Sequence, residues 1–183
     1  MAQTSYMLPL QTPAPDFALP DLDGNVVTLD SLAQAPALLV AFLCNHCPYV
    51  RHVEQVLGER TLQWQRQGVA VVGICANDPA SYPDDDRDGL ATQASRAGFG
   101  FPYLIDESQA VARAYQAACT PDFFLFDQQR RLAYRGAMDA STPGNNEPVT
   151  GDELDAAVAS VLAGTPVPEP HRPSMGCSIK WKA

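Results

Sequence analysis

Long apolar runs and an excess of positive charge are both missing from this chain of 183 residues. No stretch approaches the roughly 18 apolar residues that a membrane-spanning helix requires, which excludes such a span. The chain has 12 Lys and Arg against 21 Asp and Glu, a net charge of −9, and no basic stripe. We therefore expect neither nucleic acid nor a membrane surface as a partner.

The first residues carry neither the positive region nor the continuous apolar region of a signal peptide. The chain has five cysteines, and an odd number fits a reducing compartment better than a disulfide framework. We therefore expect a cytoplasmic protein whose cysteines serve chemistry rather than structure.

The length and the apolar content of 46% indicate one globular domain over residues 1–183. A chain of this size buries roughly 70% of the surface that it exposes when unfolded. The one compositionally biased segment is rich in proline and covers residues 164–173. It opens a tail over residues 164–183 that we expect to dock on the domain.

Apolar periodicity divides the chain into strands and helices. Residues 37–43 and 69–75 are continuous apolar runs, typical of strands buried on both faces, and residues 48–67 between them have helical spacing. Strand, helix and strand in this order predict a parallel βαβ unit with a right-handed crossover. The other expected elements are a hairpin around residues 21–25, helices near 88–97, 107–117 and 151–163, and strands near 103–105, 122–127 and 131–136.

The last residues of the tail alternate in polarity. Cys177, Ile179 and Trp181 are apolar, and the residues between them are polar. This period of two is typical of a half-buried strand. An acidic run over residues 84–88 lacks the spacing of a calcium loop, and we interpret it as a solvated loop and helix start.

Cys44-Asn45-His46-Cys47 lies between the first apolar run and the helix that begins near Pro48. A cysteine at a helix N-terminus is stabilised as the thiolate, the form that attacks disulfides and peroxides. We expect Cys44 to occupy this position and Cys47 to lie one turn further in. Taken alone, the motif is either a redox pair or half of a zinc site.

The order of elements, with Thr120-Pro121 entering a second pair of strands, resembles the thioredoxin fold. The whole chain is similar to bacterial proteins labelled thioredoxin-like or AhpC/TSA-like. The resemblance implies an α/β fold, with a central mixed sheet flanked by helices, an N-terminal β-hairpin extension and a C-terminal strand-like tail. The segments that carry it are residues 14–17 with 29–30, 44–50, 118–124 and 176–181.

In this family the motif would serve thiol–disulfide exchange, with Cys44 attacking and Cys47 resolving. The resemblance implies a cis Pro121 against the pair, and a Thr120 backbone that binds an extended peptide by strand addition. We expect no bound cofactor and no metal. The partners would be a protein or small-molecule disulfide or thiol, and a dithiol donor such as thioredoxin. The supporting residues of the active site would be Asn45, His46, Pro48, Thr120 and Pro121.

The residues around the pair allow more than one interpretation. His46 either stabilises the thiolate and makes the couple more oxidising, or faces solvent with little effect. Arg51 and His52 either add positive potential near the sulfurs or merely lie on the helix surface.

The other three cysteines differ in what they can do. Cys75 has the pattern of a small buried strand residue. Cys119 and Cys177 are possible relay thiols that would accept the disulfide from the pair. A relay requires Cα atoms within about 7 Å of each other.

Two other functions remain open. Peroxiredoxins use Pro-x-x-x-Thr/Ser-x-x-Cys, but alignment on Cys47 puts Cys44 in the hydroxyl place and Val40 in the proline place, and alignment on Cys44 fails as well. A thiol peroxidase is therefore the alternative rather than the expectation. A metal site through Cys44 and Cys47 lacks a second pair of ligands at suitable spacing.

Overall fold

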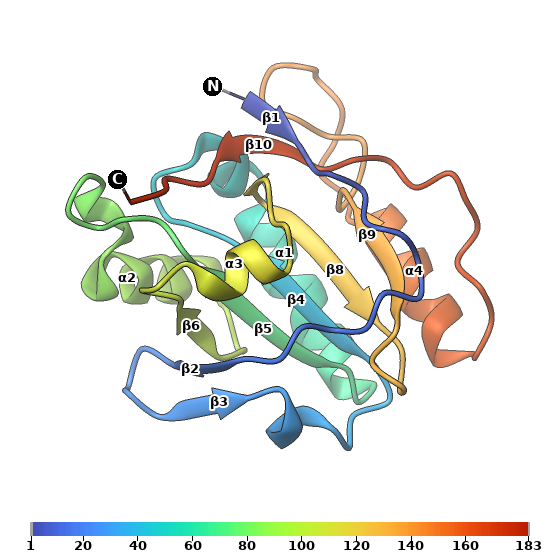
Figure 1. The fold of residues 1–183 in the computed structure, drawn as a ribbon. Coiled ribbons are helices and arrows are strands. Elements are labelled where there is room, and N and C mark those ends of the chain that lie inside the picture. The colour runs from blue at the N-terminus through green and yellow to red at the C-terminus, as the bar shows by residue number, and fades with distance from the viewer. Residues whose placement is uncertain (1, 183) are drawn as a thin grey trace.

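A five-stranded mixed sheet forms the centre of the computed structural model, which describes residues 2–182 (Figure 1). Its strands are β4 (Leu38–Phe42), β5 (Ala70–Cys75), β6 (Tyr103–Ile105), β8 (Asp122–Phe126) and β9 (Leu132–Gly136). They lie in the order β6-β5-β4-β8-β9, with β4, β5 and β6 parallel to one another. Strand β8 runs antiparallel to both of its neighbours, β4 and β9. The mixed sheet and the predicted βαβ unit are confirmed.

Helices cover one face of this sheet, and the N-terminal hairpin and a short helix cover the other (Figure 1). The first group is α1 (Pro48–Arg66), α2 (Arg87–Ala97) and α4 (Asp152–Leu162). The second is α3 (Ala110–Ala114) with the hairpin strands β2 (Ala18–Pro20) and β3 (Val26–Thr28). The short 3-10 helices are η1 (Asp30–Leu32) and η2 (Pro83–Asp85).

Strand β4 is buried on both faces, as its apolar run predicts. Leu39 and Ala41 point into the cluster beneath the helices, whereas Val40 and Phe42 point into the cluster beneath the hairpin. The Phe42 ring lies 5.6 Å from that of Tyr115, centroid to centroid, in a tilted contact. Because both faces are packed, the end of β4 is held firmly where the CxxC segment begins.

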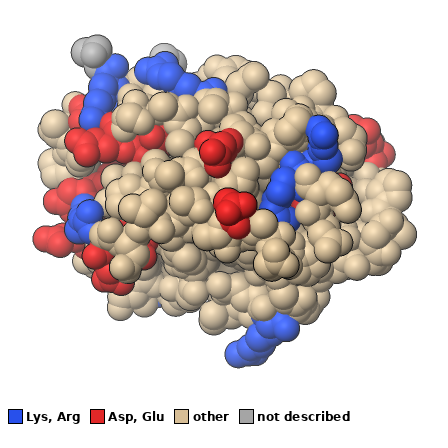
Figure 2. All heavy atoms as spheres, turned by 60° about the horizontal axis from the view of Figure 1, so that its bottom comes forward, with Lys and Arg blue, Asp and Glu red and all other residues tan. Residues whose placement is uncertain are grey.

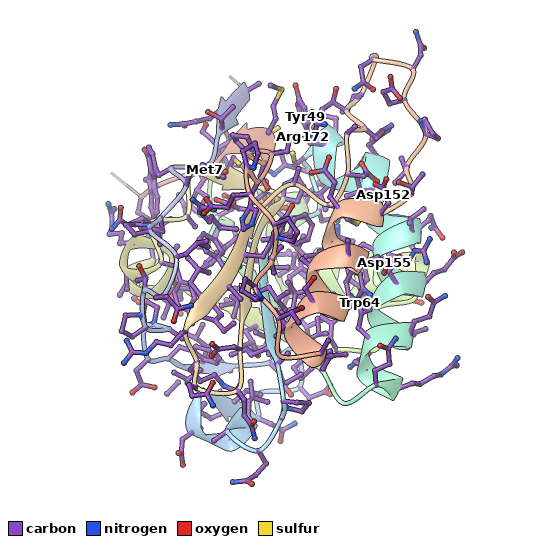
Figure 3. The ribbon with its side chains drawn as sticks, turned by 90° about the vertical axis from the view of Figure 1, so that its right-hand side faces the viewer. Met7, Tyr49, Trp64, Asp152, Asp155 and Arg172 are labelled. Carbon is purple, nitrogen blue, oxygen red and sulfur yellow. The ribbon has the colours of Figure 1, made fainter. Side chains whose placement is uncertain are left out.

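Helices α1 and α4 lie side by side and are joined by a polar link (Figure 3). The indole N–H of Trp64 donates to Asp155 at 2.6 Å, and Arg60 forms an ion pair with the same carboxylate at 2.9 Å. The link satisfies the polar edge of a Trp64 side chain that is otherwise buried. It fixes the axis of α1 relative to the C-terminal half of the domain.

The predicted helix near residues 107–117 is shorter in the structure. Gln109 precedes α3 with a φ of 62°, and Gln116 follows it with a φ of 50°, so left-handed residues bound the helix at both ends. The Gln109 amide donates to the carbonyl oxygens of Ala76 and Lys180 at 2.7 and 2.9 Å. These two hydrogen bonds hold Gln109 in a non-helical position, so the helix begins at Ala110 rather than near residue 107.

A second, three-stranded sheet joins the two ends of the chain (Figure 1). Its middle strand is the tail, so the predicted docking strand is confirmed. The period of two does not continue to Trp181, which is 40% exposed with Arg113 over its ring at 4.3 Å. The strands are β1 (Ala2–Thr4), β10 (Met175–Ser178) and β7 (Cys119–Thr120), in the order β1-β10-β7.

Charge is dispersed over the molecular face seen in Figure 2. Lysine and arginine side chains stand apart from one another there, and acidic side chains gather toward one side. The face therefore carries no continuous basic stripe. Within residues 2–182, no helix combines the length and the apolar character needed to cross a membrane.

Asp122 gives the fold a testable pH dependence. Burial raises the pKa of its carboxyl to about 7, although backbone N–H groups such as that of Ala118 act in the opposite direction. One carboxyl oxygen accepts from the Ala118 N–H at 3.2 Å, and the other has no hydrogen-bond partner. Because the folded pKa lies above the unfolded value of 3.8, the folded state holds this proton more tightly. The contribution of Asp122 to stability is present at low pH and is lost as the pH rises from 3.8 to about 7.

We expect the free energy of unfolding to lose on the order of 4 kcal/mol of this contribution between about pH 4 and pH 7. The Asp122→Asn variant has no titrating group there, and its stability should change less over the same range. Urea unfolding of both proteins at several pH values measures the difference. Equal pH dependence in the two proteins would contradict the assignment.

Candidate active site

The CxxC segment leaves the end of β4 and enters α1 at Pro48. Proline suits the first helical position, because it has no N–H to leave unpaired and its φ is already helical. Cys47 is therefore the N-cap, with extended backbone angles (φ −73°, ψ 123°). The expectation that Cys44 occupies the helix N-terminus and Cys47 lies one turn inside is wrong. Cys44 stays in the loop, and the positive end of α1 lies at Cys47.

Thr120 brings the second half of the fold against the two thiols. Its hydroxyl oxygen lies 3.1 Å from the Cys44 sulfur, and its carbonyl oxygen lies 3.2 Å from the Cys47 sulfur. The Thr120-Pro121 peptide bond is cis, as predicted. The structure thus brings together the residues that the sequence placed at the centre of the site.

The two thiols have different affinities for a proton. A hydrogen bond from the Cys44 side chain is the largest influence on Cys47 and lowers its pKa to about 4, against the opposing effect of burial. The Cys177 side chain and the Val50 N–H lower it further. Burial raises the pKa of Cys44, and so do its bond to Cys47 and the nearby charge of Asp85. These opposite directions make Cys47 the more acidic thiol of the pair.

Asp85, from η2, holds the CxxC loop in shape. One of its oxygens accepts the backbone N–H groups of Asn45 and His46 at 2.7 and 3.0 Å, and the other lies 2.5 Å from the His46 ring nitrogen. Asn77 adds a further bond at 2.8 Å. Burial acts to raise the pKa of Asp85, but the bonds from His46 and Asn77 outweigh it and the pKa is lowered.

Sequence reasoning missed this role of Asp85, which is 4% exposed and not part of a solvated loop. It lies 40 residues from Asn45 in an acidic run that shows no ligand spacing. The helix-start part of that interpretation is confirmed, because the Asp86 carboxylate accepts the Gly89 N–H as the N-cap of α2. No signal in the sequence distinguishes Asp85 from its acidic neighbours.

His46 and Asn45 act through the loop rather than at the sulfurs. The His46 ring stacks on Tyr82 at 4.7 Å and points its nitrogen at Asp85. The Asn45 amide donates to the Asp84 and Gly89 carbonyls at 2.9 and 3.0 Å. Both residues tie the loop to the segment that leads into α2.

Neither basic residue in the first turns of α1 has a hydrogen bond to a thiol. Arg51 donates to the Asn45 carbonyl at 2.7 Å, and His52 lies 2.5 Å from the Ser141 hydroxyl. Arg51 thus supports the loop, and His52 ties α1 to the segment that follows β9.

The remaining cysteines have distinct surroundings. Cys177 lies on β10, where it pairs with Thr120 and lies close enough to Cys47 to lower the pKa of that thiol. Cys119 is buried, and its thiol donates to the Pro121 carbonyl at 3.6 Å. Cys75 is buried within β5, as its strand pattern predicts.

Three potential metal ligands meet on one side of the pair. Ligand atoms of Cys44, His46 and Asp85 all lie within 4.8 Å of one another. Cys47 is not in this group. The group therefore differs from the metal site through Cys44 and Cys47 that the sequence left open. The close contact between His46 and Asp85 already engages two of the three ligand atoms.

A cavity of about 370 Å³ opens beside Pro121. It lies between the first turns of α1 and strand β10, and its lining includes Tyr49, Pro121, Met138, Arg172 and Met175. Figure 3 shows Tyr49 and Arg172 at the same end of the molecule. No cysteine is among the lining residues, so the cavity flanks the thiols without reaching them.

The chain matches the family model described as "AhpC/TSA family" over residues 10–135, a segment that includes both cysteines of the pair and Pro121. This match covers more than half of the sequence. The chain belongs to the AhpC/TSA family. The family and the thioredoxin-like fold expected from the sequence are both confirmed.

Two solved structures are similar to this chain. A hypothetical protein from Sinorhizobium meliloti 1021 is 47% identical, with a TM-score of 0.96 and coverage of 98% of both chains. A putative thiol:disulfide interchange protein DsbE from Chlorobium tepidum has a TM-score of 0.68 at 19% identity, covering 85% of this chain and 99% of its own, which shows the shared fold alone.

The thiol-disulfide oxidoreductase ResA of Geobacillus thermodenitrificans is 26% identical over 119 residues, or 65% of this chain. The match spans 64% of that protein's length, just under two thirds.

The loop-forming role of Asp85 can be tested against its neighbour. Asp85→Ala leaves the N–H groups of Asn45 and His46 without their acceptor, so we expect a loss on the order of 3 kcal/mol in the free energy of unfolding. Asp84→Ala is the matched control, because that carboxylate is exposed and lies 3.7 Å from Arg51. Its effect should stay within about 0.5 kcal/mol. Equal losses, measured by chemical denaturation, would contradict the role.

Proposed function

We propose that this chain is a thiol–disulfide oxidoreductase in which Cys47 attacks and Cys44 resolves, the reverse of the roles expected from the sequence. The observation that carries the proposal is the Cys47 thiol at the start of α1, with a pKa lowered to about 4 by the hydrogen bond from Cys44. The ResA relative supports the same reaction class.

The reaction begins with the Cys47 thiolate. It attacks one sulfur of a substrate disulfide, the substrate S–S bond breaks, and one substrate sulfur leaves as a thiolate. Cys47 is then a neutral mixed disulfide, so its charge no longer opposes ionisation of Cys44. The Cys44 thiol passes its proton to the first substrate thiolate and attacks the Cys47 sulfur, the bond between Cys47 and the substrate breaks, and the second substrate sulfur leaves as a thiolate. The products are a reduced substrate and a Cys44–Cys47 disulfide, and the reverse sequence oxidises a dithiol.

A stabilised Cys47 thiolate makes the couple oxidising, because the low pKa favours the reduced form of the protein. We place its potential closer to the roughly −120 mV of strong oxidants than to the roughly −270 mV of thioredoxin. The partners that we propose are a small-molecule or protein disulfide or thiol, and a dithiol such as thioredoxin that resets the pair. The compartment that we propose is the cytoplasm, because the number of cysteines is odd.

Substrate access differs from the expected strand addition at Thr120. In the structure β10 already pairs with β7 at Thr120, and both Cys44 and Cys47 are fully buried. A protein substrate that adds a strand there must first displace β10. The apolar cavity beside Pro121 lies next to this site, but no cysteine lines it.

The peroxidase alternative rests on Cys47, which precedes Pro48 at the start of a helix and carries the low pKa. The peroxiredoxin motif has a Thr or Ser three residues before its cysteine, and this chain has Cys44 at that place. The Thr120 hydroxyl, which lies 3.1 Å from the Cys44 sulfur, supplies a hydroxyl group near the pair from another part of the chain. Stopped-flow peroxide consumption separates the functions. A rate constant near that of free cysteine dismisses the peroxidase, and a much larger one that Cys47→Ser removes would favour it.

Substitution of single thiols tests the proposed roles. Cys47→Ser should abolish exchange with oxidised glutathione, because it removes the thiolate. Cys44→Ser should keep the first, bimolecular attack while losing the Cys44–Cys47 disulfide. The matched control is Cys75→Ala, which removes a buried thiol within β5 and should leave exchange unchanged. Exchange that survives in Cys47→Ser and disappears in Cys44→Ser would restore the roles expected from the sequence.

A further inference from the structure

Cys177 is the one cysteine of the five that reaches the protein surface. It is partly exposed, whereas Cys44, Cys47, Cys75 and Cys119 are all buried. Of the five thiols, Cys177 is therefore the most accessible to an external dithiol.

Strand pairing places Cys177 at the residue that contacts both buried thiols. Cys177 pairs with Thr120 in the antiparallel register of β10 and β7. The same Thr120 contacts Cys44 through its hydroxyl and Cys47 through its carbonyl. The Cys47 sulfur also interacts with both the side chain and the backbone N–H of Cys177. Cys177 thus occupies the place that a substrate cysteine would take on an added strand.

The close approach of β10 depends on a glycine. A Cβ atom on Gly176 would lie 1.9 Å from the Thr120 carbonyl oxygen, so no other residue fits without moving one of the strands. Beyond the strand, the Lys180 N–H donates to Asn77 at 2.8 Å and the Lys182 N–H donates to Gln109 at 2.9 Å. The tail is therefore fastened on both sides of Cys177, since β1 pairs along its outer edge.

We propose that Cys177 is a third redox thiol, which carries the disulfide between the buried Cys44–Cys47 pair and external thiols. This inference rests on the proposed function. In the first step the Cys177 thiolate attacks the Cys47 sulfur of the Cys44–Cys47 disulfide. That S–S bond breaks, Cys44 leaves with the electron pair and takes up the proton that Cys177 gave up, and a Cys47–Cys177 disulfide forms.

The second step uses an external dithiol as the reductant. One of its thiolates attacks the sulfur of the partly exposed Cys177, and Cys47 leaves as the thiolate. The second thiol of the dithiol then attacks the mixed disulfide and releases Cys177. The dithiol ends as a disulfide, and the protein regains three reduced cysteines.

The electrostatics of Cys177 and Cys47 favour the attack by Cys177 and the later departure of Cys47. Burial raises the pKa of Cys177 to about 11, and the hydrogen bond and charge of Cys47 contribute, whereas Lys180 acts to lower it. The contribution of Cys47 vanishes when that sulfur enters a disulfide, so Cys177 becomes more acidic in the state in which it must attack. In the second step Cys47 is also the better leaving group, because low-pKa thiolates leave faster.

A trapping experiment with oxidised glutathione tests the first contact. In Cys44→Ser, attack by Cys47 should give a glutathione adduct that Cys177 resolves, and acid-quenched peptide mass spectrometry should find a Cys47–Cys177 disulfide. In the double variant Cys44→Ser/Cys177→Ser, the adduct on Cys47 should persist. A persistent adduct in both variants would overturn the role of Cys177 and leave the proposed function standing. An adduct in neither would count against the proposed function itself.

Reduction kinetics test the relay in the chain with an intact pair. The Cys44–Cys47 disulfide of Cys177→Ser should be reduced by dithiothreitol about tenfold more slowly than that of the unmodified chain. The two rates should become equal in denaturant, where access no longer depends on the fold. Cys119→Ala is the matched control, since that thiol lies on β7 but donates to the Pro121 carbonyl, and its rate should be unchanged. Equal rates for folded Cys177→Ser and the unmodified chain would overturn the proposal.

Discussion

The contact between Thr120 and the cysteines is the constraint on which the site depends. Thr120 contacts Cys44 through its hydroxyl, contacts Cys47 through its carbonyl, and pairs with Cys177. The main sheet holds it there, because Asp122 pairs with Phe42 where β8 begins and β4 ends. Local sequence therefore supplies two of the thiols, and the topology supplies the residue that brings three of them together.

The negative charge at this site is stabilised by hydrogen bonds and not by a cation. Within residues 2–182, no lysine or arginine is hydrogen-bonded to the Cys47 sulfur, and the pKa of that thiol is lowered mainly by the Cys44 side chain. Hydrogen bonds to the charged form favour it even when the group is buried. Asp85 contributes in the opposite sense at Cys44, because its charge raises that pKa. The same carboxylate thus shapes the loop and helps to place the charge on Cys47.

The sequence predicted the features that depend on local pattern. The apolar runs located β4 and β5, and the order of elements predicted the mixed sheet and the cis Pro121. It also contained the signal for the true helix start, since Pro48 favours the first helical position and so places Cys47 at the N-cap. The predicted helix start near Pro48 is therefore confirmed, and it leaves Cys44 in the preceding loop rather than at the helix N-terminus.

Long-range contacts account for what the sequence did not reveal. Asp85 accepts hydrogen bonds from Asn45 and His46, which lie about 40 positions earlier in the chain. In the sequence alone, nothing separates Asp85 from the other acidic residues beside it. Alternation predicted a strand near Cys177, but a period of two does not name the partner strand. The pairing with Thr120, which fills the expected peptide-binding edge, follows only from the folded arrangement.

The central claim is that Cys47 carries the charge of the reduced pair. Thiolate absorbance, followed as the reduced protein is titrated from acid to alkaline pH, tests it most directly. The account predicts a single thiolate that appears near the Cys47 pKa of about 4, with Cys44 ionising only far above its usual range. Cys47→Ser should remove the acidic step, and Cys44→Ser should move it to higher pH. An acidic step that persists in Cys47→Ser and disappears in Cys44→Ser would contradict the account.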